Sequence, residues 1–174
     1  MSRAFLKNES ADDPVVIPAR APLPPGVMNY VTRRGLTLLH TELDALEAER
    51  AQSQADNQDE TERTRQLAQL NGRIGALNQR IATAKVVENG QVQDRDQDLH
   101  IRFGATVSLR SSKPTVPDRQ LTIVGVDEAD ATHGLIAFTA PIARLLLGKR
   151  MGESIALRTA QGETMMEISA IAYV

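Results

Sequence analysis

The chain has 174 residues, with 20 basic and 22 acidic side chains and a formal net charge of −2 at pH 7. A protein that binds nucleic acid through phosphates alone is usually basic, and 3% aromatic residues leave little for base stacking, so free nucleic acid is not the expected partner. There is no cysteine, no spaced histidine motif and no apolar run near the roughly 18–20 residues that cross a bilayer, so we expect a cytoplasmic protein without disulfides or a membrane segment.

The first 31 residues contain five of the eight prolines. Because proline fixes φ and lacks a backbone N–H, this stretch cannot be a regular helix or a central strand. We interpret residues 1–31 as an extended, disordered extension. The alternative, a segment packed along the domain surface, stays open.

Residues 32–88 contain no proline and carry two seams of apolar residues with a polar stretch between them. The spacing within each seam alternates between three and four residues, which is typical of packed coiled-coil helices. The seams are Leu36, Leu39, Leu43 and Leu46, and then Leu67, Leu70, Ile74, Leu77, Ile81 and Ala84. This pattern predicts an antiparallel helical hairpin, with Thr32 as the N-cap of its first helix.

The register of the seams predicts where the hairpin turns. Pairing Leu36 with Leu77 and Leu46 with Leu67 at equal heights places the reversal near position 56 or 57. The run Asp56-Asn57-Gln58-Asp59 has turn-forming residues there. Beyond Leu46 and Leu67 the seam positions are polar, so the distal part should be the least stable part of the hairpin.

Residues 89–102 are interpreted as a linker that begins with the helix-stop signal Asn89-Gly90. The acidic run from Asp94 to Asp98 resembles the start of a calcium loop. Leu99 and Ala105 stand where that loop needs glycine and glutamate, so a solvated connector is favoured.

Residues 103–174 change to the alternation that is typical of half-buried strands, with runs at 105–109, 121–124, 135–138, 154–159 and 163–174. Gln161-Gly162 suggests a hairpin between the last two. A short helix is bracketed by Pro141 and Gly148. Its apolar residues, Ile142, Leu145 and Leu146, are expected to pack in the core. The chain is therefore predicted to be α+β, a helical hairpin followed by a small antiparallel β-sheet domain with one helix.

Three segments, Phe103–Val107, Ile123–Asp130 and Pro141–Lys149, resemble the signature segments of the GreA/GreB transcription elongation factors in order and spacing. The resemblance covers roughly residues 30–174. It implies an FKBP-like C-terminal domain over 103–174 that docks at the rim of the secondary channel of bacterial RNA polymerase. It also implies that the hairpin enters this channel, where tip carboxylates help the polymerase to cleave its backtracked RNA.

The family tip reads Asp-x-x-Glu-x-x-acid, and the matching run is Asp56-Asn57-Gln58-Asp59-Glu60-Thr61-Glu62. Asp59 replaces the glutamate, and Glu60 is the possible substitute. By resemblance, Asp56, Asp59, Glu60 and Glu62 are the candidate catalytic carboxylates. Asp56 and Asp59 would share a Mg²⁺ ion with the polymerase, because phosphodiester hydrolysis benefits from two hard cations. The alternative is a solvated helix-turn face.

Two other places are candidate contacts with the polymerase. Arg63, Arg65 and Arg73 on the returning arm could meet RNA phosphates or polymerase acids, or could serve only solubility. By resemblance, the turn Thr139-Ala140-Pro141 touches the polymerase rim. Ala140 stands where the family usually has serine, which removes an N-cap hydroxyl.

The hairpin is shorter than the coil of the family by roughly three helical turns, and the proline-rich tail is extra. A channel-occupying competitor or inhibitor is therefore the main alternative to a cleavage factor. A prolyl isomerase would need an aromatic pocket, whereas Phe103, Phe138 and Tyr173 are more simply core residues. A plain coiled-coil adaptor is the last alternative. We expect a monomer with no cofactor and no nuclease site of its own.

Overall fold

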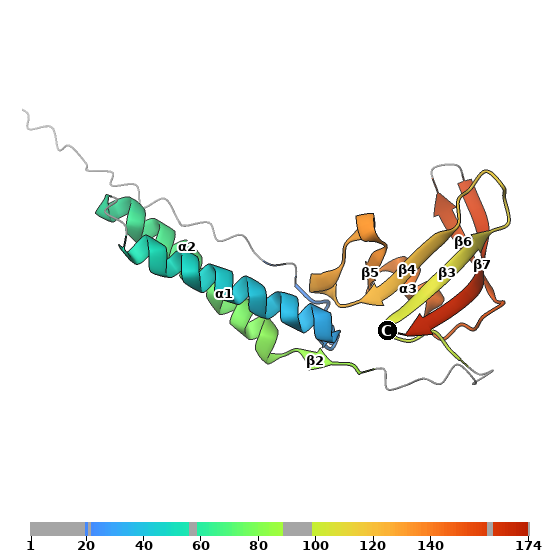
Figure 1. Ribbon diagram of the computed structural model, residues 1–174, viewed down its shortest axis with the longest axis horizontal. Coiled ribbons are helices and arrows are strands. Elements are labelled where there is room, and N and C mark those ends of the chain that lie inside the picture. Colours follow the sequence, from blue (N-terminus) through green and yellow to red (C-terminus); the bar gives the residue numbers. More distant parts are fainter. Residues whose placement is uncertain (1–19, 21, 56–58, 89–98, 160–161, 174) are drawn as a thin grey trace, which may run out of the picture.

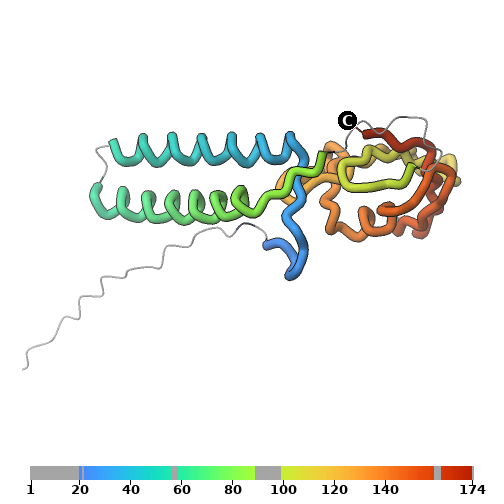
Figure 2. The backbone as a smooth tube through the Cα atoms, turned by 90° about the horizontal axis from the view of Figure 1, so that it is seen from below, coloured from blue at the N-terminus to red at the C-terminus, as the bar shows by residue number. Residues whose placement is uncertain are grey.

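The computed structural model describes residues 20, 22–55, 59–88, 99–159 and 162–173. Two helices, α1 (Arg33–Ala55) and α2 (Glu60–Ala82), run antiparallel and form a rod (Figures 1 and 2). The rod projects from a curled β-sheet domain, and α1 ends and α2 begins at the end of the rod that is farthest from this domain. None of the helices in the described ranges has the length and apolarity that crossing a bilayer requires.

The starts of both helices carry residues that stabilise a helix N-terminus. The Thr32 hydroxyl accepts a hydrogen bond from the backbone N–H of Gly35 at 2.8 Å, so Thr32 caps α1 as predicted. Glu60 and Glu62 stand in the first turn of α2, where the helix dipole favours negative charge. The helices end and begin on either side of the predicted turn, of which Asp56, Asn57 and Gln58 lie outside the described residues.

The predicted apolar seams form the core of the hairpin. Half of the ten seam residues are buried together with Val31, namely Leu39, Leu46, Leu70, Ile74 and Leu77. Leu36, Leu43, Ile81 and Ala84 pack against them from partly exposed positions. Farther out the contact becomes polar, as expected: Ser53 is buried there, and Arg50 donates to the Asn71 side chain at 3.5 Å. The hairpin is therefore held mainly by its half nearest the sheet domain.

Two short strands, β1 (Tyr30–Val31) and β2 (Lys85–Val86), pair in parallel at the base of the rod. The N–H of Lys85 donates to the Asn29 carbonyl at 2.8 Å, and that of Val87 donates to the Val31 carbonyl at 3.0 Å. Asn29 is buried, and its amide donates to the Arg80 carbonyl at 2.8 Å. This end of the proline-rich stretch is thus packed, as the alternative interpretation expects, rather than mobile.

The sheet domain has five strands in the order β5-β4-β3-β7-β6. Their bounds are β3 (Ala105–Ser111), β4 (Arg119–Val124), β5 (Leu135–Ala137), β6 (Ser154–Thr159) and β7 (Gly162–Tyr173). All neighbours are antiparallel except β4 and β5, which are parallel, so the prediction of a purely antiparallel sheet is wrong at this edge. The connection between them contains two 3₁₀ turns, η1 (Val126–Glu128) and η2 (Ala131–His133), which return the chain to the end of the sheet where β4 began.

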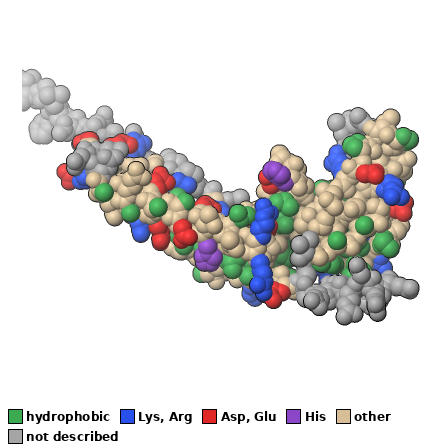
Figure 3. Space-filling view, viewed as in Figure 1, with side chains coloured by type: hydrophobic (Ala, Val, Ile, Leu, Met, Phe, Trp, Pro, Cys, Tyr) green, Lys and Arg blue, Asp and Glu red, His purple; other side chains and the backbone are tan. Residues whose placement is uncertain are grey.

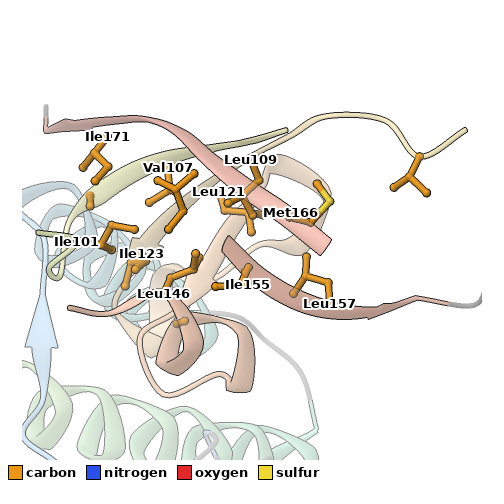
Figure 4. Packing of buried hydrophobic residues seen from close by; sticks show 14 residues of the cluster. Ile101, Val107, Leu109, Leu121, Ile123, Leu146, Ile155, Leu157, Met166 and Ile171 are labelled. Carbon is orange, nitrogen blue, oxygen red and sulfur yellow. The ribbon is translucent and has the colours of Figure 1, made fainter. Parts of the chain in front are cut away.

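The core of the domain lies between the sheet and α3 (Pro141–Leu146). Figure 4 shows Leu146 of the helix beside Ile123 and Ile155 of the sheet. Val107, Ile123 and Leu146 have no exposed surface. Proline at the first helical position and Gly148 at φ +83° bracket α3 as predicted, because glycine adopts this left-handed conformation without strain.

Candidate functional site

The predicted acidic residues lie at the free end of the rod. Asp59, Glu60 and Glu62 are exposed where α2 begins, and Asp56 lies outside the described residues. Asp59 occupies the N-cap position of α2, but its side chain makes no capping hydrogen bond. Figure 3 shows acidic and basic side chains at the end of the rod that is farthest from the sheet domain. The acids are therefore placed for contact with a partner that meets the rod end-on.

The chemistry of this tip is limited to what a few exposed carboxylates can do. No group of three or more metal-ligating side chains occurs within the described ranges. Magnesium prefers oxygen ligands and keeps several of its waters, so one or two carboxylates suffice to complete a site that is held mostly by other groups. The described tip carboxylates, Asp59, Glu60 and Glu62, are oxygen ligands of the type that magnesium accepts.

The three candidate arginines do not form one patch. Arg65 and Arg73 are exposed on α2, whereas Arg63 is half-buried. At 3.6 residues per turn, Arg63 and Arg65 point to nearly opposite sides of the helix. Arg73 lies on the order of 15 Å farther along the axis than Arg63. The arrangement offers separate cations along the shaft rather than a single binding surface.

The predicted docking turn connects β5 to α3. Thr139 and Ala140 are half-buried and Pro141 is exposed. As expected from the missing serine, Ala140 provides no side-chain cap for α3. The turn borders a cavity of about 400 Å³ that is lined in part by Pro141, Ile142 and Leu145.

Leu145 corrects the sequence interpretation, because it is 48% exposed rather than a core residue. Ala143 and Leu146, three positions apart, form the buried face of α3. Leu145 is rotated by about one residue, or 100°, from Leu146 and so faces outward. The helical period could have indicated that Leu145 and Leu146 face different sides. A helix of six residues, however, is too short for the period to show which of its faces is buried.

Sequence reasoning missed the junction between the rod and the sheet domain. Glu128 of η1 is buried against the start of α1, where it accepts a hydrogen bond from the Thr32 hydroxyl and an ion-pair contact from Arg34 at 3.0 Å. Gly35 permits this approach, since a Cβ there would lie 2.7 Å from Glu128 Oε2. Gly125 has the same role on the other side, where a Cβ would lie 2.8 Å from the Tyr30 carbonyl oxygen.

Aromatic rings also meet at the junction. Tyr30 of β1 lies 6.1 Å from Phe103 and 5.8 Å from Phe138, and the two phenylalanines are 5.6 Å apart, measured between ring centroids. These tilted and edge-on contacts are favourable aromatic geometries. Tyr173 donates from its hydroxyl to the His100 carbonyl at 2.6 Å. Phe103 and Phe138 thus pack against Tyr30 between the rod and the sheet domain, and Tyr173 bonds to the backbone at His100, so these rings serve packing and do not line an isomerase pocket.

The chain is similar to known transcription elongation factors. The family model "Transcription elongation factor, GreA/GreB, C-term" matches residues 96–173. Transcription elongation factor GreA of Azorhizobium caulinodans is 35% identical over 127 residues, which cover 72% of this chain and 78% of that protein. GreA of Ralstonia nicotianae is 32% identical over 159 residues, which cover 82% and 96%. Among solved structures, Gfh1 of Thermus thermophilus is 21% identical with a TM-score of 0.38, covering 84% of this chain and 99% of that one.

Proposed function

Because the chain belongs to the GreA/GreB family of transcription elongation factors, we propose that it enters the secondary channel of bacterial RNA polymerase and stimulates cleavage of backtracked nascent RNA. One observation carries the proposal: exposed acids lie at the free end of a two-helix rod whose other end is fixed to a compact domain. The rod carries the acids to a distant site, and the domain remains outside to dock.

The length of the rod sets its reach. Each helix contains 23 residues, so at a rise of about 1.5 Å per residue the rod is roughly 35 Å long. Packing of the apolar seam stiffens the half near the domain, and the turn Thr139-Ala140-Pro141 is the proposed contact with the channel rim. Arg65 and Arg73, exposed along the shaft, would meet polymerase acids or RNA phosphates on the way.

The tip residues would act on a metal that the polymerase shares. Asp59, together with Asp56, would supply oxygen ligands, and the exposed Asp59 carboxylate fits the ligand preference of Mg²⁺. When bound, a second Mg²⁺ ion stabilises charge on the oxygens of the phosphodiester. Glu60 and Glu62 keep the tip negative, which favours the approach of a cation. We propose that the catalytic site itself belongs to the polymerase, because isolated carboxylates bind Mg²⁺ only weakly.

The test measures RNA cleavage in stalled, backtracked polymerase complexes. We expect the wild-type protein to stimulate cleavage and the double variant Asp56→Asn with Asp59→Asn to lose at least roughly tenfold, since the loss of even an outer-shell partner of a metal site typically costs about 10–100-fold. Asp44→Asn is the matched control, because Asp44 is an exposed acid on the shaft of α1. RNA incubated with the protein and Mg²⁺, but without polymerase, should stay intact.

Binding to the polymerase is measured separately, through competition with a labelled copy of the protein. If the wild-type protein binds but does not stimulate cleavage, the shortened rod acts as a channel-occupying competitor and the proposed activity is wrong. If the Asp44 variant loses as much cleavage as the tip variant, overall negative charge rather than the tip carries the effect.

A further inference from the structure

Arg20 connects parts of the molecule that are far apart in sequence. Its guanidinium donates to Asp127 Oδ1 of η1 at 2.6 Å and also pairs with Glu42 on α1. Arg80 on α2 places its Nε 3.4 Å from the other oxygen of Asp127. These four residues, which we term the base clasp, therefore join both helices, the sheet domain and the segment that precedes the hairpin.

The base clasp is largely shielded from water. The side chains of Arg80 and Asp127 are 8% and 9% exposed, that of Arg20 is 22% exposed and that of Glu42 is 43% exposed. Removing one member of a shielded ion pair leaves the other charge without compensation, which is costly. Burial lowers the pKa of Arg20, but its hydrogen bonds to Glu42 and Asp127 outweigh this and raise the pKa, so the guanidinium stays charged.

The segment between Arg20 and the hairpin lies against α2. Figure 2 shows it as a loop at the base of the rod, beside the junction with the sheet domain. Its turn is closed by a hydrogen bond from the Val27 N–H to the Pro24 carbonyl at 3.1 Å, and Gly26 adopts φ +76° there. At its far end the Asn29 amide donates to the Arg80 carbonyl. We term Arg20 and residues 22–29 the strap, which is thus anchored at both ends.

Through Arg20 and Glu42, the strap contacts α1 at a different position along the helix axis from the other junction contacts. Thr32, Arg34 and Gly35 meet Glu128 at the first turn of α1. Glu42 lies seven residues beyond Gly35, which corresponds to roughly 10 Å along the helix axis. If the hairpin tilts about the contact between the first turn of α1 and Glu128, a restraint at that distance resists the tilt much more effectively than further contacts at the first turn itself.

We propose that Arg20 is a positioning residue, which fixes the angle between the hairpin and the sheet domain and so sets where the acidic tip lies relative to the docking turn. The inference deepens the proposed function and, for its effect on cleavage, rests on it. A tilt of about 5° at the base of a rod roughly 35 Å long moves its tip by about 3 Å. A misplacement of about 1 Å can already cost on the order of 100-fold in rate, so the restraint matters for a shared metal site.

The structural test uses two spin labels. The sequence has no cysteine, so Ala48→Cys on α1 and Met151→Cys in the sheet domain, both exposed, can be labelled selectively and the distance between them measured. Arg20→Gln should broaden the distance distribution. Arg20→Lys, which keeps the charge, should give a distribution almost as narrow as that of the wild type. Arg33→Gln is the matched control, because it removes an arginine whose ion pair, with Glu88, lies at an exposed position.

Circular dichroism checks that each variant keeps its helices. An unchanged distance distribution in folded Arg20→Gln would overturn the proposal. If Arg20→Gln does not fold, Glu42→Gln, which breaks only the contact with α1, must broaden the distribution, or the inference is wrong. The measurement needs no polymerase, so it can succeed or fail independently of the proposed function. In the cleavage assay we expect Arg20→Gln to lose roughly tenfold with near-normal binding, and Arg20→Lys to recover.

Discussion

Replacing Leu39 by alanine should destabilise the hairpin, whereas replacing its neighbour Leu38 should not. Leu39 is 2% exposed within the cluster between α1 and α2, and Leu38 is 43% exposed on the outside of the same helix. The two substitutions remove the same atoms from adjacent positions. Any difference between them therefore reports the packing of the seam and not helix propensity or chain entropy.

The expected cost follows from burial. Truncating a buried leucine to alanine typically costs about 2–5 kcal/mol, and we expect about 3 kcal/mol for Leu39 because a seam between two helices can partly close. For a chain of this size, that corresponds to a fall of roughly 6–12 °C in Tm. Leu38→Ala should stay within about 0.5 kcal/mol of the wild type, since surface changes of this kind are usually small.

Thermal unfolding followed by helical circular dichroism measures both variants. The signal reports mainly on the hairpin, because α1 and α2 contain 23 residues each and α3 only six. Equal losses in the two variants would mean that Leu39 is not packed between the helices. The reasoning from the two-seam pattern to an antiparallel hairpin would then be refuted.

Three further predictions concern the junction, the rod and the sheet domain. Gly125→Ala should destabilise the protein by roughly 1–3 kcal/mol in thermal unfolding, because the added Cβ would lie 2.8 Å from the Tyr30 carbonyl oxygen. Gly75→Ala, on the open face of α2, should instead stabilise the protein by about 0.5–1 kcal/mol, because the added Cβ would meet no neighbouring element within 4 Å. Hydrogen bonds from the Thr132 hydroxyl and with the His133 ring are the main causes that lower the pKa of Asp130 to about 2, so the stabilisation that this carboxylate gives the folded state should be present above about pH 4 and be lost as the pH falls through 2. Titration of the Asp130 carboxyl by NMR checks this, and Thr132→Ala should raise the pKa; an apparent pKa near 4 in the unmodified protein would contradict it.

The hairpin could be predicted from the sequence because its stabilising contacts are periodic. Seam residues recur at regular spacing, and both helix ends carry local signals, of which the Thr32 cap is confirmed by its hydrogen bond. The exposure of Asp59, Glu60 and Glu62 at the tip follows from the same register. Their role in binding a metal stays a prediction, as does the role of Asp56, which lies outside the described residues.

The junction could not be predicted, because its contacts join residues that are far apart in sequence. Arg20 and Asp127 are separated by 107 positions, and Thr32 and Glu128 by 96. Composition alone indicated a mobile proline-rich tail, whereas one arginine with two carboxylate partners fixes its end. In the sheet, alternation located β5 but carried no information on strand direction, so its parallel pairing with β4 was missed.

The strand order has a consequence for the way this chain matures during synthesis. The contacts between α1 and α2 fall within a continuous stretch of chain that ends before residue 88, whereas β3 pairs with β7, a strand that follows it by more than 50 residues. At about 5–20 residues per second, the ribosome needs several seconds to supply that strand. The rod can therefore form while the sheet domain still lacks β7, the neighbour of the central strand β3, so that Val107 and Leu109 of β3 are without their partners on β7 during this interval.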